Sequence, residues 1–353
     1  MKVLLRASES RWLAPAAVLA AVLLTLLLTA VPIRLAGANP AAAFERYLVT
    51  PLTTFGSLGE VLLTATPLLF TGLAVAIAFR VGYFNIGAEG QFLAGTIAAS
   101  IPALYLPDLP APIALPLALA AGAVGGTAWA FLPAWLKRHA GIDEVVTTLL
   151  LNPVALLLVQ GLLNGPWRNS ATGFPDSDRF GAGYDLPRLI EGSRVHAGLL
   201  LAVLLVAVTW IVMSATPLGL RLRAAGQSPS AARFSGIRVT SLQWRCALVS
   251  GAVAGLGGAS QVLGVQHQLT ASVSNGYGYT GIVVATLGAL AAGGVLLAAL
   301  LLGTISVGAQ NASIVLQLPT QMGAIVSSTL LLAAVGFLAA RRYRLALRRR
   351  RVR

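Results

Sequence analysis

The chain of 353 residues is too apolar to fold as a water-soluble globule. Hydrophobic residues make up 57% of it, charged residues only 10%, and its mean hydropathy is +0.81. Soluble domains carry roughly 25% charged residues, so this composition excludes them and indicates an integral membrane protein. In a membrane protein, the net charge of +14 indicates first how the chain is oriented across the bilayer and that it contacts lipid headgroups.

Apolar runs that could cross a bilayer as α-helices recur along the chain. Such a helix needs about 17–25 residues to cross roughly 30 Å of hydrocarbon. The clear runs are residues 13–33, 58–79, 113–136, 145–163, 197–213, 242–263 and 322–340. Residues 84–104 form a further, more polar run, and 281–318 are long enough for two spans with a turn near Gly293 and Gly294. We therefore predict an all-α polytopic bundle of about ten transmembrane helices.

The first run is expected to stay in the mature protein. A signal peptide has an apolar core of about 7–15 residues, and residues 13–33 exceed that length. We predict one membrane-spanning domain over residues 1–353, with spans within 13–340, a cytoplasmic loop at 216–238 and a basic cytoplasmic tail at 341–353.

Basic residues are distributed unevenly between the two predicted sides. With a cytoplasmic N-terminus, the inward segments hold eleven lysines and arginines between Lys2 and Arg245 and eight arginines between Arg341 and Arg353, nineteen of the 25 in the chain. Positive residues favour cytoplasmic loops, so both termini are predicted to be cytoplasmic and the number of spans even. The expected partner of this charge is membrane lipid with anionic headgroups, not nucleic acid.

The sequence lacks the motifs of common catalytic sites. Its only lysines are Lys2 and Lys137, and neither follows the glycine-rich pattern of a nucleotide-phosphate loop. The three histidines lie far apart without cysteine partners, which argues against zinc, and Cys246 is the single cysteine. We expect no catalytic residue, metal or cofactor in this chain, which favours transport over enzymatic activity.

Polar side chains interrupt the predicted spans at two places. Asn85, Glu89 and Gln91 lie between two apolar segments. Glu144, directly before the span predicted at 145–163, and Asn152 within it fall near one face of that candidate helix. Polar groups inside a membrane usually face a cavity or pair with one another. Two interpretations stay open for both places: the residues line or gate a solute path, or they join helices by hydrogen bonds.

A second polar cluster flanks a predicted outward connection. Its candidate path residues are Gln261, Gln266, Asn275 and Tyr277. Amide and phenol groups suit a neutral solute with many hydroxyls and ring nitrogens. The alternative is a loop that only docks an extracytoplasmic protein.

Two glycine pairs predict close helix packing. Gly122 and Gly126, and likewise Gly251 and Gly255, are four residues apart within predicted spans. This spacing lets helix backbones approach closely in a membrane.

The loop at 216–238 contains the signals of a short helix. Ser228 is a good N-cap, Pro229 suits the first helical position, and Gly236 suits the residue beyond the end. The pattern predicts a helix over 229–235. So short a helix needs a surface to pack on, which favours docking to another protein over a basic loop on lipid headgroups.

Two motifs together resemble a known family. The stretch Phe84-Asn-Ile-Gly-Ala-Glu-Gly-Gln91, with the loop pattern Gly219-x-x-x-Arg223-Ala-x-Gly226 followed by Ala231 and Gly236, resembles permease subunits of ABC importers of the ribose and branched-chain amino acid type. The resemblance is nearest to the nucleoside and simple-sugar branch. It implies a membrane path for a nucleoside or simple sugar; the alternatives are a branched-chain amino acid or other polar solute, or an ion-coupled secondary transporter.

The resemblance also implies partners and a location. It implies cytoplasmic ATP-binding subunits, a second permease subunit, identical or homologous, and an extracytoplasmic solute-binding protein, in a bacterial or archaeal cell membrane. The ATPase activity belongs to the separate subunit. The residues implied to couple to it are Gly219, Arg223, Gly226, Ser228, Pro229, Ala231, Phe234 and Gly236.

Overall fold

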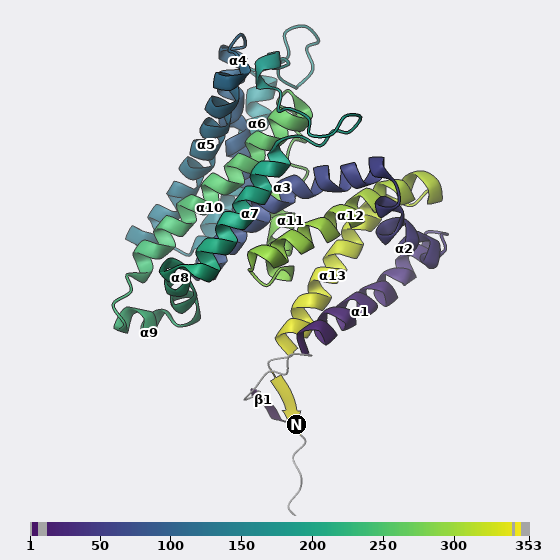
Figure 1. The fold of residues 1–353 in the computed structure, drawn as a ribbon, viewed down its shortest axis with the longest axis vertical. Helices are drawn as coiled ribbons and strands as arrows, with labels where there is room; N and C mark the ends of the chain where they lie inside the picture. Colours follow the sequence, from purple (N-terminus) through teal and green to yellow (C-terminus); the bar gives the residue numbers. More distant parts are fainter. Residues whose placement is uncertain (1, 6–12, 341–342, 347–353) are drawn as a thin grey trace, which may run out of the picture. The chain divides into compact units, whose positions relative to one another are not determined.

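The computed structural model describes residues 2–5, 13–340 and 343–346, in two compact units (Figure 1). Unit 1 comprises Met1–Leu58 and Thr304–Arg353, and unit 2 comprises Gly59–Gly303. Most of the predicted basic tail at 341–353 lies outside the described residues.

Unit 1 is built on two helices from opposite ends of the sequence. Helix α1 (Leu13–Leu35) packs along α13 (Gln321–Ala340). The chain then bends by 120° into a second helical stretch, where the Asn39 side chain accepts a hydrogen bond from the Ala41 N–H at 2.9 Å. The other elements are β1 (Lys2–Leu5), α2 (Pro40–Leu48), η1 (Thr50–Leu52) and β2 (Tyr343–Ala346), with β1 and β2 paired antiparallel.

Unit 2 holds most of the helices and both predicted polar clusters. Figure 1 shows α5 and α10 running side by side, with α8 and α9 at one end of the unit. The elements are α3 (Phe55–Arg80), α4 (Ala88–Tyr105), α5 (Ala111–Ala140), α6 (Glu144–Asn164), η2 (Ala182–Tyr184), α7 (Gly198–Ala215), α8 (Pro217–Gln227), α9 (Pro229–Phe234), α10 (Val239–Gln261), the π-helix η3 (Val262–Gln266) and α11 (Tyr277–Leu287). Helix α12 (Ala292–Leu316) begins in unit 2 and ends in unit 1. Cys246 lies on α10 and is 8% exposed.

A glycine seam, formed by Gly95, Gly122, Gly126, Gly251 and Gly255, joins α4, α5 and α10. A Cβ built on Gly255 would lie 2.2 Å from the Gly122 carbonyl oxygen, and one built on Gly95 would lie 2.3 Å from the Gly255 Cα. The three backbones are therefore in direct contact. The close packing predicted from the two glycine pairs is confirmed.

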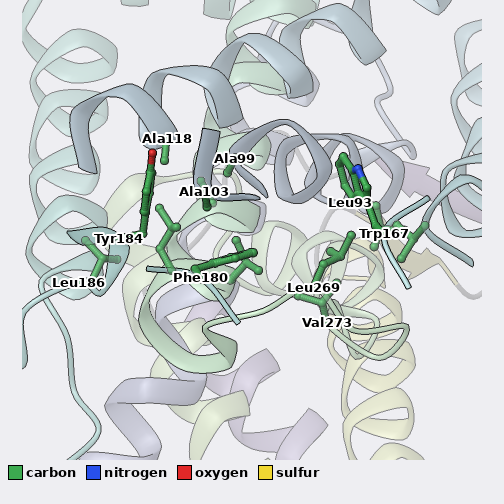
Figure 2. Close-up of a cluster of buried hydrophobic side chains, with 14 of the residues drawn as sticks. Leu93, Ala99, Ala103, Ala118, Trp167, Phe180, Tyr184, Leu186, Leu269 and Val273 are labelled. Atoms are coloured by element: carbon green, nitrogen blue, oxygen red, sulfur yellow. The ribbon is translucent and has the colours of Figure 1, made fainter. Parts of the chain in front are cut away.

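A hydrophobic cluster in unit 2 joins side chains of α4, α5, α6, η2 and α10 with those of the connections before α7 and α11 (Figure 2). Its members include Leu93, Ala99 and Ala103 of α4, Tyr184 of η2 and Val273 of the connection before α11. The buried Tyr184 hydroxyl donates to the Pro102 carbonyl at 2.8 Å. The long connection between α6 and α7 is thus packed into the unit by its apolar side chains.

The described residues support the predicted all-α membrane protein but not the predicted number of about ten spans. Six described helices are long and apolar enough to cross a membrane, or seven if the bent α1–α2 pair is one span. The predicted run at 84–104 begins as a nonhelical turn and becomes helical only from Ala88. In place of two spans in 281–318, α11 has only eleven residues, about 16 Å at 1.5 Å per residue, too short to cross.

The turn between α11 and α12 also lies earlier than predicted. It occupies residues 288–291 instead of Gly293 and Gly294, and Ala289 and Leu290 take left-handed backbone angles, φ +51° and +57°. A Cβ on Gly294 would lie 2.2 Å from the Gly288 carbonyl oxygen. Gly294 therefore lies outside the turn and packs against Gly288, the residue at which the turn begins.

Candidate functional site

The nonhelical turn at residues 81–87, here called the elbow, links α3 to α4. Gly82 has φ +74°, which glycine adopts without steric cost. The Asn85 side chain accepts a hydrogen bond from the Gly87 N–H at 2.9 Å. The Gln91 N–H then donates to the Gly87 carbonyl, which begins α4. Of the predicted polar motif, Asn85 therefore lies in a folded turn, whereas Glu89 and Gln91 lie in the first turn of α4.

Asn85 and Gln91 form a buried amide pair. The Asn85 Nδ2 donates to Gln91 Oε1 at 2.8 Å, and Gln91 Nε2 donates to Asn85 Oδ1 at 3.1 Å. The second Asn85 donor reaches Ser250 Oγ on α10 at 2.9 Å, and Ser250 in turn donates to the Ala74 carbonyl of α3. With the Gly87 contact, the two donors and two acceptor positions of Asn85 are filled within the described part of the chain.

Three side chains of α6 hold the backbone of the elbow and of the first turn of α4. Glu144 Oε1 accepts from the Phe84 N–H at 3.2 Å, and Thr148 Oγ1 accepts from the Ile86 N–H at 3.1 Å. Asn152 accepts from the Gly90 N–H and donates to the Ile86 carbonyl, both at 2.9 Å. Glu144 also pairs with Lys137 of α5. These contacts join α6 to the elbow.

Glu89 is directed to a different element, the N-terminus of α11. Its Oε2 accepts from the Gly278 N–H at 2.7 Å, its Oε1 accepts from the Ser274 hydroxyl, and the Tyr279 N–H also reaches it. Glu89 is 6% exposed. A carboxylate that accepts free backbone N–H groups stabilises a helix start, so Glu89 caps α11 from another helix.

The predicted path residues therefore separate into groups. Asn85 and Gln91 pair with each other, and Glu144 and Asn152 bind the backbone of the elbow and the first turn of α4. Glu89 lies beside the segment that carries Asn275 and Tyr277, whose side chains are hydrogen-bonded to each other. Gln261 ends α10 and is 4% exposed, and Gln266 ends the π-helix that follows.

Some residues of this network carry no pattern in the sequence. Ser250, Ser274 and Gln243 join it from segments more than 150 positions along the chain from their partners, with Gln243 Nε2 donating to the Gly82 carbonyl at 3.1 Å. Serine and glutamine in an apolar run have no periodicity that would reveal such a partner. The only available signal was their polarity inside a predicted span.

The predicted short helix is present as α9, over Pro229–Phe234, and a helix precedes it that we did not predict. Ser228 Oγ accepts from the Ala231 N–H at 3.4 Å, and Gly236 beyond the end has φ +80°. Phe234 is 96% exposed. The unpredicted helix is α8, which Thr216 caps through the Gly219 N–H at 3.3 Å.

His196 is a buried histidine in the connection before α7. It is 2% exposed, and its Nδ1 accepts a hydrogen bond from the Gly198 N–H at 3.1 Å. Burial, and then the nearby His267, lower the pKa of His196 to about 4. His267 itself lies 2.6 Å from Asp185 through its Nδ1. His196 is therefore neutral in the folded protein near pH 7.

We expect acid to destabilise the protein through His196. An unfolded histidine has a pKa near 6.5, so this contribution is complete above about pH 6.5 and is lost as the pH falls toward 4, at most about 3 kcal/mol. The measurement is the thermal unfolding midpoint in detergent between pH 7.5 and 4.5. His196→Gln should flatten this pH dependence, whereas His139→Gln, at an exposed histidine, should keep it; equal slopes would contradict the assignment.

Long apolar helices packed on a glycine seam define a polytopic membrane protein. The family model described as the permease component of the branched-chain amino acid transport system matches residues 57–335. The chain belongs to this permease family.

Several relatives of similar length have names that state a transported solute. A glucose ABC transporter permease of Haloferax volcanii is 36% identical, covering 96% of this chain and 92% of its own. The guanosine permease NupP of Bacillus subtilis is 36% identical, over 78% of this chain and 79% of its own. The nucleoside permease NupB of Lactococcus lactis is 32% identical, over 82% of this chain and 82% of its own. Each organism also has a second similar permease, at 26–29% identity.

Proposed function

We propose that this chain is the membrane subunit of an ATP-driven importer and forms the path for a nucleoside, with a simple sugar as the next candidate. The observation that carries the proposal is α9, a six-residue helix that is capped at its start and followed by a left-handed glycine. The side chain of Phe234, at its end, is 96% exposed. Such a short helix gains little stability alone. An exposed aromatic side chain beside Arg233 and Arg238 suits a groove on a cytoplasmic ATPase subunit.

The second permease of the assembly is proposed to be a relative and not a second copy. Three organisms with a permease 32–36% identical to this chain each have another at 26–29%. A solute-binding protein would deliver solute at the end of unit 2 opposite α9. Pairing of β1 with β2 brings the first and last described segments together, which supports both termini lying on the same side of the membrane. We propose that this side is the cytoplasm of a bacterium or archaeon, since basic residues favour that side.

Solute contact is assigned to Gln261, Gln266, Asn275 and Tyr277. Asn85 has no hydrogen-bonding position left for a solute within the described structure, and Glu144 and Asn152 bind backbone. These three therefore hold helices together. Amides and a phenol suit a neutral, hydroxyl-rich solute, and the named relatives carry glucose, guanosine and nucleosides, which favours such a solute over a branched-chain amino acid.

Transport by the reconstituted assembly tests the proposal. The chain would be placed in proteoliposomes with the ATPase, second permease and binding protein encoded beside it, and uptake of labelled guanosine, glucose and leucine measured with and without ATP. We expect ATP-dependent uptake, fastest for guanosine. Uptake by this chain alone in response to a proton or sodium gradient would show a secondary transporter instead.

Phe234→Ala should separate ATP hydrolysis from uptake. Loss of the projecting ring should lower solute transported per ATP at least tenfold, because a central aromatic side chain typically dominates such a contact. Phe174→Ala is the matched control, since Phe174 is 68% exposed on the connection between α6 and α7, and it should leave the ratio unchanged. An unchanged ratio in Phe234→Ala would reject docking through α9.

A further inference from the structure

Helix α8 is in direct backbone contact with the end of α3. A Cβ built on Gly226 would lie 2.2 Å from the Arg80 carbonyl oxygen and 3.4 Å from the Gly82 nitrogen. Leu222 and Ala225 of the same helix are 3% and 0% exposed. Because no side chain separates the two backbones, α8 cannot move toward the elbow without displacing it.

The elbow is joined to the surrounding helices strongly enough to move with them. Gln243 of α10 holds the Gly82 carbonyl, Glu144 and Thr148 of α6 hold two of its N–H groups, and Asn85 is fixed to Ser250. Closely packed elements move as bodies and do not deform continuously. The elbow, α4, α6, α8 and α10 thus form one mechanical body, which carries α9.

Glu89 connects this body to α11. Glu89 stands in the first turn of α4, directly after the elbow, and its carboxylate holds the Ser274 hydroxyl and the Gly278 N–H. A Cβ on Gly278 would lie 2.2 Å from the Glu89 nitrogen. The start of α11 therefore lies directly on the first turn of α4.

The geometry points to Glu89 as a positioning residue that makes α11 follow the body moved by α9. When α11 moves with this body, Asn275 and Tyr277 would change their position in the solute path from one state of the transport cycle to the next. This inference rests on the proposed function, and it replaces direct solute contact as the role of Glu89. Backbone contact at Gly278 can push α11 but cannot pull it. Without the carboxylate, α11 could therefore lag behind when the body that carries α9 moves away from it.

The test compares Glu89→Gln with Glu60→Gln in the full reconstituted assembly. Glutamine keeps the size of the side chain but offers one acceptor oxygen in place of two. Glu60 is a helix glutamate paired with Arg194 at the surface, 37% exposed on its side chain, and serves as the control. The readouts are assembly with the ATPase, ATP hydrolysis stimulated by loaded binding protein, KM for solute, and solute transported per ATP.

We expect Glu89→Gln to assemble, to keep stimulated hydrolysis within twofold and KM within threefold, and to lose at least tenfold in solute per ATP. Glu89→Asp should recover part of that ratio, and Glu60→Gln should match the unmodified protein. A raised KM with an unchanged ratio would overturn the inference in favour of solute contact. Failure to assemble, or uptake reduced only in proportion to folded protein, would overturn it in favour of a purely structural role.

These outcomes are separate from those that test the proposed function. If the unmodified assembly shows no ATP-dependent uptake, the importer itself is rejected. If the unmodified assembly transports and Glu89→Gln transports with the same ratio, only the positioning role is rejected.

Discussion

Gly255→Ala is expected to prevent the protein from reaching its folded state, although it adds one methyl group. That methyl would lie 2.2 Å from the Gly122 carbonyl oxygen and 2.9 Å from the Gly126 Cα. The atoms it meets are backbone atoms of α5, so α5 and α10 would have to separate. Overpacking a well-packed interior commonly costs about 1–3 kcal/mol and sometimes more, and here the seam that joins α4, α5 and α10 opens along its length.

The same substitution at Gly161 is the control. Gly161 lies in α6, and a Cβ there would meet no described atom within 4 Å. Alanine favours a helix over glycine by about 1 kcal/mol, so Gly161→Ala should be neutral or slightly stabilising. Yield of monodisperse protein in detergent and its unfolding midpoint measure both. A Gly255→Ala protein with a normal midpoint would show that the seam is looser than the structure has it.

Asn85→Ala should destabilise the protein by about 3 kcal/mol or more. The change leaves the Gln91 amide and the Gly87 N–H without their partner in a buried site, and each such stranded group costs about 1–3 kcal/mol. The unfolding midpoint in detergent is the measurement. Adding Gln91→Leu should recover part of the loss, because it removes one of the stranded groups instead of leaving it buried.

Asn164→Ala tests whether burial is the cause of this cost. Asn164 is also an amide on a helix, but it is exposed, and its Nδ2 donates to the Gln160 carbonyl of the same helix at 2.8 Å. We expect a change within about 0.5 kcal/mol, as for most surface substitutions. Equal effects at positions 85 and 164 would show that the amide pair contributes no more than a surface contact.

Features set by neighbouring residues could be predicted from the sequence. The caps around α9 are Ser228, Pro229 and Gly236, all within eight positions, and the helix lies where they place it. The glycine pairs on α5 and α10 needed only their four-residue spacing and an apolar context. In each case the physical cause, a cap or a small side chain on one helix face, is local.

The number of spans could not be predicted because composition does not reveal where an apolar segment turns. Residues 281–318 carry no charged side chain, yet the chain reverses at 288–291 through left-handed Ala289 and Leu290. Neither residue favours that conformation by itself. Tertiary packing of Gly294 onto Gly288 supports the turn, and hydropathy cannot report such a contact.

The hydrogen-bond partners of the polar motif could likewise not be predicted from the sequence. Glu89 lies 185 positions from Ser274, and Asn85 lies 165 from Ser250. The sequence showed that polar groups sit at the edge of an apolar segment and therefore need partners. It left open whether the partners are solute or protein, and only the folded arrangement identifies protein groups.

The burial of Cys246 makes the chain suited to spectroscopy by attached labels. It is the single cysteine of the sequence and is 8% exposed, so a thiol reagent should leave it largely unmodified in the folded protein. Cysteines introduced at Phe234 and Phe174, 96% and 68% exposed, could then be labelled selectively in an otherwise native background. Electron paramagnetic resonance between such spin labels would report, in distances, how far α9 travels during one ATP cycle.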